Sequence, residues 1–209
     1  MNPRIFKINA HRSLSYYTPE DVAAMLAKAE AERDAAYKKA RVVKHYKDIN
    51  GVTPHPTYLK KVESVMNARW HAYFYNLCGV NALMSKDPST KVGAVIVRPD
   101  KTVASMGMNG FARGCDDSPH LYANREVKYS RIIHAEMNAI LTAKEPLTGY
   151  TLYVYPMPPC ERCAAHVIQS GIKHIVSPAI KETDRWFESC TNARRMFDEA
   201  GVTWEELDP

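Results

Sequence analysis

Residues 151–177 read TLYVYPMPPCERCAAHVIQSGIKHIVS, and this stretch decides the fold. Its two ends, Thr151–Tyr155 and Lys173–Ser177, are short runs rich in β-branched and aromatic residues, which predicts a strand at each end. We expect the segment between them, Cys160–Ser170, to form a helix. Strands that alternate with helices are typical of an α/β protein, in which helices cover the faces of a central sheet.

The sequence upstream of this stretch continues the alternation. Val92–Val97 is a continuous apolar run, which is typical of a strand buried on both faces. Pro99–Lys101 predicts a hairpin turn, and Thr102–Met108 predicts the returning strand. We expect a polar loop over Asn109–Arg131 and a helix over Ile132–Ala143.

The C-terminal sequence adds a helix at Asn192–Ala200, which Gly201 closes, and an edge strand at Val202–Trp204. The sheet then has about five strands, which is too few for an eight-stranded barrel. We therefore predict an α/β sandwich in which helices flank a mostly buried sheet.

Two long helices are expected before the first strand. One begins near Thr18, a residue that can cap a helix N-terminus, and extends over residues 18–47. The second covers Leu59–Met84, where apolar residues recur three and four positions apart. We assign residues 1–65 to an N-terminal helical extension and residues 66–209 to the main domain.

The composition is that of an ordinary globular protein: 209 residues, of which 45% are apolar and 24% charged. The sequence has no run of about 20 apolar residues of the kind that crosses a membrane. Met1–Arg12 lacks the apolar core of a secretory signal. We therefore expect a cytoplasmic protein without a membrane partner.

The net charge of +5 belongs to the N-terminal third of the chain. Residues 1–69 hold 13 Lys and Arg against 7 Asp and Glu, and residues 70–209 hold 15 against 16. A protein that holds a long polyanion usually carries its positive charge around the working cleft. The charge distribution therefore disfavours a nucleic-acid partner for the main domain.

The five cysteines are an odd number and do not suggest a disulfide framework. Only Cys160 and Cys163 are close in sequence, and at the start of a helix their sulfurs project the same way. The N-terminal end of a helix also favours thiolates over thiols. His134, near the start of another predicted helix, supplies a third ligand. One nitrogen and two sulfurs suit zinc, with the fourth tetrahedral position open to water.

Glu136 stands two residues after His134 and is not needed to hold the metal. Zinc can lower the pKa of a bound water to about 7, and a nearby carboxylate can then carry protons from that water to a substrate. A C-x-x-C pair alone is as often a redox pair or half of a structural zinc site. Neither alternative uses an unliganded glutamate beside the metal, so we predict a catalytic site with Glu136 as its proton carrier.

The pattern H-x-E followed by P-C-x-x-C is the signature of the zinc-dependent nucleobase deaminases. Over roughly Trp70–Ser177 the chain resembles the deoxycytidylate (dCMP) deaminase family of the cytidine deaminase superfamily. The resemblance rests on residues 85–94 (SKDPSTKVGA), 109–111 (NGF), 134–140 (HAEMNAI) and 159–164 (PCERCA). It implies a three-layer sandwich with a mixed sheet of about five strands, a zinc cofactor, and conversion of dCMP to dUMP and ammonia. It also implies a homo-oligomer, often a hexamer.

The resemblance assigns roles to individual residues. The implied zinc ligands are His134, Cys160 and Cys163, and the implied proton shuttle is Glu136. The implied substrate-binding residues are Asn109, Ser85, Lys86, Ala135 and Arg113. Many members have an arginine immediately before the Ser-Lys-Asp-Pro run, where this chain has Met84. The phosphate must then be met by Lys86, Arg113 or another basic residue.

Other functions stay open on the sequence alone. A deaminase acting on a base in tRNA or single-stranded nucleic acid would use the same metal site, with the basic residues near 33–47 holding the polyanion. A modified cytosine nucleotide is a further alternative substrate. A non-catalytic zinc module would have no use for Glu136. Arg185 and Trp186 either cover a base or a subunit contact, or are a packed tryptophan beside a surface arginine.

Overall fold

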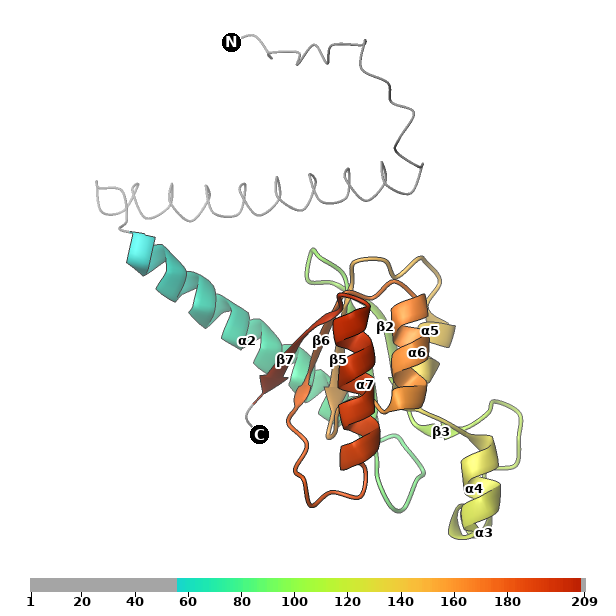
Figure 1. The fold of residues 1–209 in the computed structure, drawn as a ribbon. Helices are drawn as coiled ribbons and strands as arrows, with labels where there is room; N and C mark the ends of the chain where they lie inside the picture. The colour runs from blue at the N-terminus through green and yellow to red at the C-terminus, as the bar shows by residue number, and fades with distance from the viewer. Residues whose placement is uncertain (1–55, 208–209) are drawn as a thin grey trace, which may run out of the picture. The chain divides into compact units, whose positions relative to one another are not determined.

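The computed structural model describes residues 56–207, which form a five-stranded sheet with helices on both faces (Figure 1). In chain order the strands are β1 (Gly93–Val97), β2 (Val103–Met108), β5 (Thr151–Tyr155), β6 (His174–Pro178) and β7 (Thr203–Leu207). Their order across the sheet is β2-β1-β5-β6-β7. β1 pairs antiparallel with β2 and β5, whereas the β5–β6 and β6–β7 pairs are parallel. The predicted mixed sheet is confirmed.

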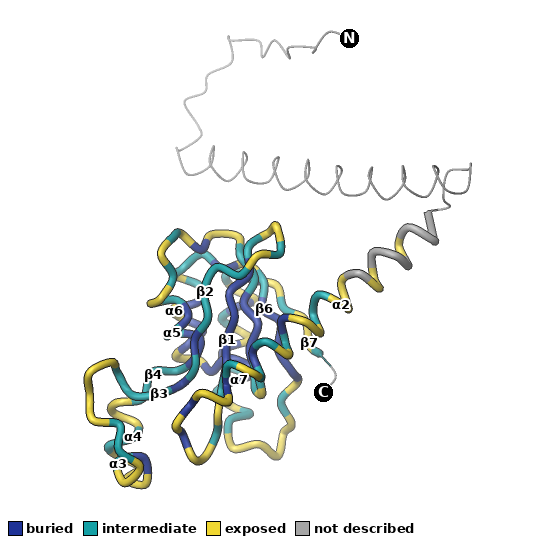
Figure 2. The backbone as a smooth tube through the Cα atoms, turned by 180° about the vertical axis from the view of Figure 1, so that it is seen from behind, coloured by how far each residue is buried: buried dark blue, intermediate teal, exposed yellow. Residues whose placement is uncertain are grey.

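Alternation of side chains along β1 explains the three layers. The covering helices are α2 (Pro56–Ala82), α5 (Ala135–Thr142), α6 (Glu161–Gln169) and α7 (Phe187–Glu199). Ala94 and Ile96 face the side of the sheet that packs against α5, α6 and α7. Val95 and Val97 face the opposite side, which α2 covers. Every residue of β1 is buried, as its dark tube in Figure 2 shows, so the predicted sandwich with a doubly buried strand is confirmed.

Aromatic contacts attach α2 to the sheet. The ring of Phe74 lies 5.1 Å from the ring of Tyr153 on β5, and Trp70 stacks on Phe74 with ring centres 5.5 Å apart. The thiol of Cys78 donates a hydrogen bond to the carbonyl oxygen of Tyr153 at 3.3 Å. Phe74 and Cys78 are both fully buried. The apolar period that predicted this helix agrees with the packed face only in part, because Trp70 and Leu77 of that period pack on the sheet whereas Tyr73 and Val80 are exposed.

The segment predicted as a polar loop contains regular structure instead. It holds β3 (Gly110–Phe111), α3 (Pro119–Ala123) and α4 (Arg125–Arg131), and β4 (Ile132–Ile133) follows it directly. We call residues 110–133 the lobe. β3 and β4 pair antiparallel, and α3 and α4 extend away from the sheet (Figure 1). The side chain of Asn124 accepts hydrogen bonds from the backbone N–H groups of Glu126 and Val127, which caps α4.

Two helix boundaries also differ from the prediction. α5 begins at Ala135 instead of Ile132, because Ile132 and Ile133 pair with β3 as strand β4. α7 begins at Phe187, which is earlier than the expected Asn192. The predicted edge strand is also longer than expected, since β7 runs to the end of the described residues.

The N-terminal expectations are only partly covered by the structure. The helix expected over residues 18–47 lies outside the described residues, whereas α2 agrees with the second predicted helix. The division into residues 1–65 and 66–209 stays a prediction. Within residues 56–207, no helix is both long and apolar enough to cross a membrane.

Gly107 on β2 lets α5 approach the sheet closely. A Cβ at this position would overlap the carbonyl oxygen of Ala135 and the amide nitrogen of Ala139. Both atoms belong to the backbone of α5, so the helix itself would have to move to admit a side chain. The glycine is therefore needed for the distance between the strand and the helix, and not for a turn.

We expect Gly107→Ala to lower the free energy of unfolding by about 3 kcal/mol, because the added methyl group has no space. Gly79→Ala is the matched control, since a Cβ there would contact only the side chain of Tyr155, at 3.9 Å. Alanine should stabilise that helical position by about 0.5–1 kcal/mol. Urea denaturation measures both variants, and a Gly107→Ala protein as stable as the wild type would contradict the close approach.

Candidate metal and catalytic site

Two helix N-termini bring the three predicted metal ligands together. His134 immediately precedes α5, Cys160 immediately precedes α6, and Cys163 lies in the first turn of α6. The Nδ1 atom of His134 lies 3.4 Å from Sγ of Cys160 and 3.3 Å from Sγ of Cys163. All three donor atoms lie within 4.8 Å of one another, so they could hold one metal ion.

The donor set fits zinc. An imidazole nitrogen and two sulfurs are ligands that zinc prefers, and three protein ligands leave one tetrahedral position for water or substrate. Among the described residues, this is the one cluster of three or more such groups. The residues present therefore suit a zinc ion that keeps an open position more than a closed structural zinc.

Ionisation of the cluster favours metal binding. A hydrogen bond from the Cys163 thiol lowers the pKa of Cys160 to about 4, and His134 adds to this effect, so Cys160 is a thiolate at neutral pH. The same hydrogen bond and burial raise the pKa of Cys163. The hydrogen bond with Cys160 also raises the pKa of His134. One sulfur is thus ready to bind a cation, and metal binding would release the proton of the other.

Glu136 occupies the first turn of α5 and is 4% exposed. Burial raises the pKa of its carboxyl group, and the charge of His134 opposes that rise. A carboxyl group whose pKa moves toward neutrality can both take up and release a proton at working pH. The structure therefore places an acid–base group next to the possible metal ligands and outside the set of donor atoms that could hold the ion.

Two cavities meet at this cluster. The larger, which we call the outer cleft, has a volume of about 800 Å³, and the smaller, the inner pocket, has a volume of about 80 Å³. His134 and Cys160 line both cavities. Glu136 lines the inner pocket together with two predicted substrate-binding residues, Asn109 and Ala135. The cluster therefore opens on to a space that suits a small-molecule ligand.

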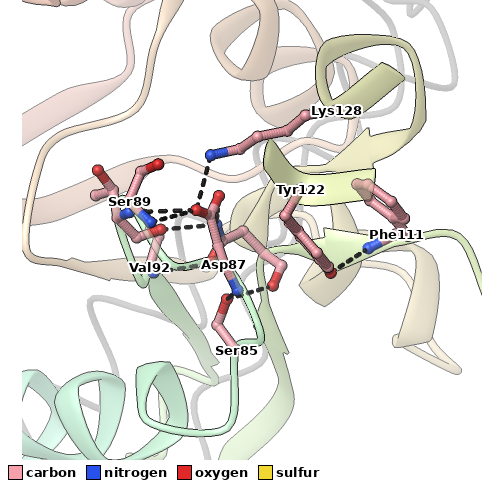
Figure 3. A network of polar contacts seen from close by, with 9 residues as sticks. Ser85, Asp87, Ser89, Val92, Phe111, Tyr122 and Lys128 are labelled. Atoms are coloured by element: carbon pink, nitrogen blue, oxygen red, sulfur yellow. Dashed lines mark hydrogen bonds and ion pairs between the residues drawn. The ribbon is translucent and has the colours of Figure 1, made fainter. Parts of the chain in front are cut away.

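Asn109 donates a hydrogen bond to Asp87, which lies at the centre of a network of polar contacts (Figure 3). Its Nδ2 donates to Oδ2 of Asp87 at 3.2 Å and to the carbonyl oxygen of Thr90 at 2.9 Å. Its Oδ1 accepts the backbone N–H of Val92 at 2.8 Å. Lys128 pairs with the other carboxylate oxygen of Asp87 at 2.7 Å. Both amide N–H groups of Asn109 are used in this way, and its Oδ1 keeps one lone pair for a ligand.

The other predicted substrate-binding residues lie outside both cavities. The buried hydroxyl group of Ser85 donates to the carbonyl oxygen of Asn109 at 2.8 Å. Lys86 is exposed and pairs with Asp117 at 2.7 Å, and Arg113 is exposed in the lobe. Their contacts with substrate stay predictions, and the geometry gives those predictions no support.

Among the wall residues that sequence reasoning missed are three on α4. Arg125 lines the outer cleft, Lys128 lines the inner pocket, and Tyr129 lines both. The signal that could have found them is Asn124, an N-cap residue that begins a helix inside the expected loop. With 7 residues, α4 is too short for an apolar period to reveal it.

Two arginines lie over aromatic rings at the wall of the outer cleft. The guanidinium carbon of Arg125 is 5.2 Å from the ring centre of Tyr129, and that of Arg185 is 5.1 Å from the ring centre of Trp186. Arg185 and Trp186 line both cavities, so the pair that the sequence left open belongs to the site wall. Neither arginine makes an ion pair with a described residue, so both present positive charge to the cleft.

Known proteins with similar sequences share this metal-binding region. Residues 68–178 match the family model for the cytidine and deoxycytidylate deaminase zinc-binding region. The chain is 42% identical over 147 residues to the "uncharacterized deaminase in luxG 3′ region" of Aliivibrio fischeri. This match covers 68% of this chain and 98% of that protein. The chain is also 34% identical over 146 residues to the deoxycytidylate deaminase of Homo sapiens. That match covers 67% of this chain and 80% of the human protein.

Solved structures share the fold. The apo form of the dCMP deaminase from the cyanophage S-TIM5 matches with a TM-score of 0.51 at 22% sequence identity, covering 66% of this chain and 96% of that chain. The same enzyme in complex with dCMP and dUMP also gives a TM-score of 0.51, at 21% identity, covering 65% of this chain and 95% of that chain. These likenesses support the mixed sheet with flanking helices.

In the metal-free protein near pH 6, we expect iodoacetamide to label Cys160 at least about tenfold faster than Cys78 or Cys190. A pKa of about 4 keeps Cys160 a thiolate at that pH, whereas burial raises the pKa of Cys190 to about 12 and also raises that of Cys78. The Cys160 rate should change little up to about pH 8, while an ordinary thiol of pKa about 8.5 would gain roughly a hundredfold.

Zinc loading is the control for this labelling experiment, because a coordinated sulfur should be protected from the reagent. Exposed Cys115 reports that the reagent is active in both samples. Peptide mass spectrometry measures each site separately. If the labelling rate of Cys160 rises with pH as the rate of an ordinary thiol does, the ionisation assigned to the cluster is wrong.

Proposed function

The chain belongs to the cytidine and deoxycytidylate deaminase zinc-binding family, and from this premise we propose that it deaminates a free pyrimidine nucleotide hydrolytically, converting dCMP to dUMP and ammonia with zinc as cofactor. The observation that carries the proposal is the cluster of His134, Cys160 and Cys163 beside Glu136, where two cavities meet. The choice of dCMP is supported by the deoxycytidylate deaminases among the relatives.

Proton transfer by Glu136 is the centre of the proposed mechanism. Zinc held by the cluster would supply a water of pKa about 7, and thus a nucleophile at neutral pH. Glu136 takes a proton from the attacking water and passes it to N3 of the cytosine ring as the water oxygen bonds to C4. It then moves the hydroxyl proton to the amino group, so that ammonia leaves and C4 keeps a carbonyl oxygen. The raised pKa of this buried carboxyl group suits both transfers.

Asn109 is the residue that we assign to the sugar. Its amide N–H groups are occupied by Asp87 and Thr90, so it meets a ligand as an acceptor through Oδ1. A sugar hydroxyl group is a donor of the matching kind. Ala135 is fully buried at the inner pocket and contributes only a methyl group, which leaves room for the base beside Glu136.

Arg125 and Arg185 are the residues that we assign to the phosphate. Both line the outer cleft, and stacking on aromatic rings orders their guanidinium groups without neutralising them. A guanidinium group offers paired donors that match phosphate oxygens. We give these two arginines the phosphate role for which the sequence offered Lys86, Arg113 or another basic residue, because neither Lys86 nor Arg113 lines the outer cleft or the inner pocket.

The charges of the outer cleft favour a free nucleotide over a nucleic acid. Its three arginines are accompanied by Glu161 and Glu188, so the surplus of positive charge is small. Affinity for a long polyanion needs several phosphate contacts near the cleft. A modified cytosine nucleotide stays an alternative substrate, and the homo-oligomer, a hexamer by resemblance, stays a prediction.

We expect Glu136→Gln to lower kcat for dCMP by about 10²- to 10⁴-fold, because an amide cannot carry the protons. Zinc content should stay stoichiometric, since Glu136 is not among the clustered donors. Glu126→Gln, in the exposed first turn of α4, is the matched control and should leave kcat unchanged. Ammonia release measures turnover. Wild-type turnover by Glu136→Gln would contradict the mechanism, and a zinc-loaded wild type inactive on every pyrimidine nucleotide would contradict the function.

We expect Arg125→Gln and Arg185→Gln each to raise the KM for dCMP by about tenfold or more, since a hydrogen bond to a charged group contributes about 1.5–3 kcal/mol. The kcat/KM for deoxycytidine, which lacks the phosphate, should change little. Arg194→Gln is the matched control, because Arg194 also lies over a tryptophan, 3.9 Å from the ring centre of Trp204, but lines neither cavity. Equal losses for dCMP and deoxycytidine would exclude the phosphate role.

A further inference from the structure

The lobe forms part of the site wall although it has little apolar anchorage to the sheet. α4 has no buried residue, and its extensive contacts are with α3 and β3, which also belong to the lobe. The buried ring of Tyr122 on α3 stacks on Phe111 of the same lobe, with ring centres 4.2 Å apart. Yet α4 supplies Arg125, Lys128 and Tyr129 to the cavity walls. An interaction other than apolar packing must hold α4 beside the inner pocket.

A buried ion pair provides that attachment (Figure 3). Nζ of Lys128 lies 2.7 Å from Oδ1 of Asp87, and the two side chains are 12% and 4% exposed. The same Oδ1 accepts the backbone N–H groups of Ser89 at 2.8 Å and Thr90 at 3.3 Å, which fix the carboxylate in the segment before β1. Water screens a pair this buried only weakly. Removing one partner would leave the other as an uncompensated buried charge.

The same carboxylate also reaches the residue that we assign to the sugar. While Oδ1 of Asp87 binds Lys128, Oδ2 accepts a hydrogen bond from Nδ2 of Asn109 at 3.2 Å. One buried group therefore couples the position of α4 to the orientation of the Asn109 amide. A change at Lys128 should move both the wall of the inner pocket and the acceptor inside it.

We propose that Lys128 is a positioning residue: its ion pair with Asp87 holds α4 as a wall of the inner pocket and fixes the Asn109 amide for substrate binding. Glu136 carries the protons, so Lys128 acts on substrate binding and not on the chemical step. The kinetic part of this inference rests on the proposed function. The inference that the ion pair attaches α4 is independent of the proposed function.

A second Lys–Asp pair offers a matched comparison. Lys86 and Asp117 join the same two parts of the chain, the segment before β1 and the lobe, and their N–O distance is also 2.7 Å. Their side chains are 65% and 45% exposed, however, and an exposed pair contributes little to stability. Asp117→Asn therefore removes an ion pair between the same two segments but leaves no buried charge without a partner, which makes it the matched control.

Steady-state kinetics with dCMP and hydrogen exchange of the full-length, zinc-loaded protein test the proposal. Lys128→Met should raise the KM by about tenfold or more with kcat within about threefold, and the amides of Arg125–Arg131 should exchange at least about tenfold faster. Zinc content should not change. Lys128→Arg, which keeps the charge, should restore both KM and protection. Asp117→Asn should leave both at the wild-type values.

The proposal is overturned if folded, zinc-loaded Lys128→Met keeps the wild-type KM and exchange rates, or if Asp117→Asn has equal effects. A fall in kcat at unchanged KM also overturns it, because Lys128 would then act in the chemistry. If Lys128→Met does not fold, Lys128→Gln takes its place; it removes the charge but keeps a donor for Asp87, so we expect smaller changes of KM and exchange in the same directions. If the wild type does not turn over dCMP, the proposed function fails, and hydrogen exchange still decides whether Lys128 holds α4.

Discussion

The site depends on how closely α5 approaches the sheet. Gly107 on β2 has no side chain, and the backbone of α5 occupies the space that a Cβ would take. His134 and Glu136 lie at the start of this helix, so its position places a possible metal ligand and an acid–base group together. Cys160 and Cys163 come from α6, which packs on the same face of the sheet. The distances of 3.3 and 3.4 Å between nitrogen and sulfur therefore follow from backbone packing.

The pKa values of two neighbouring groups of the site shift in opposite directions, although burial acts to raise both. Cys160 stays ionised because hydrogen bonds stabilise its thiolate more than burial destabilises it. Glu136 receives less compensation, so burial raises the pKa of its carboxyl group. Opposite shifts of this kind fit the two groups to different roles in one site. Here the sulfur is prepared to hold a cation and the carboxyl group to exchange protons.

Patterns in the sequence predicted the features that depend on local physics. The apolar run of β1 and the C-x-x-C pair each lie within one window of about 11–18 residues, and the period of α2 repeats within a window of that length. The lobe was predicted as a loop because its helices are short and because Lys128 is held by Asp87, 41 residues away. No local pattern encodes that contact. The same limit applies to the contact between Lys86 and Asp117, 31 residues apart.

The metal cluster and the substrate wall have different kinds of support. The helices that carry His134 and Cys163 share one buried apolar core, whereas α4 is held beside the pocket by a charge pair. Sequence changes in the lobe can therefore alter which nucleotide fits without moving the sulfur and nitrogen atoms that could hold the metal. Such a separation suits a family whose model spans both cytidine and deoxycytidylate deaminases, because a shared fold takes on different substrates through the residues around a common centre.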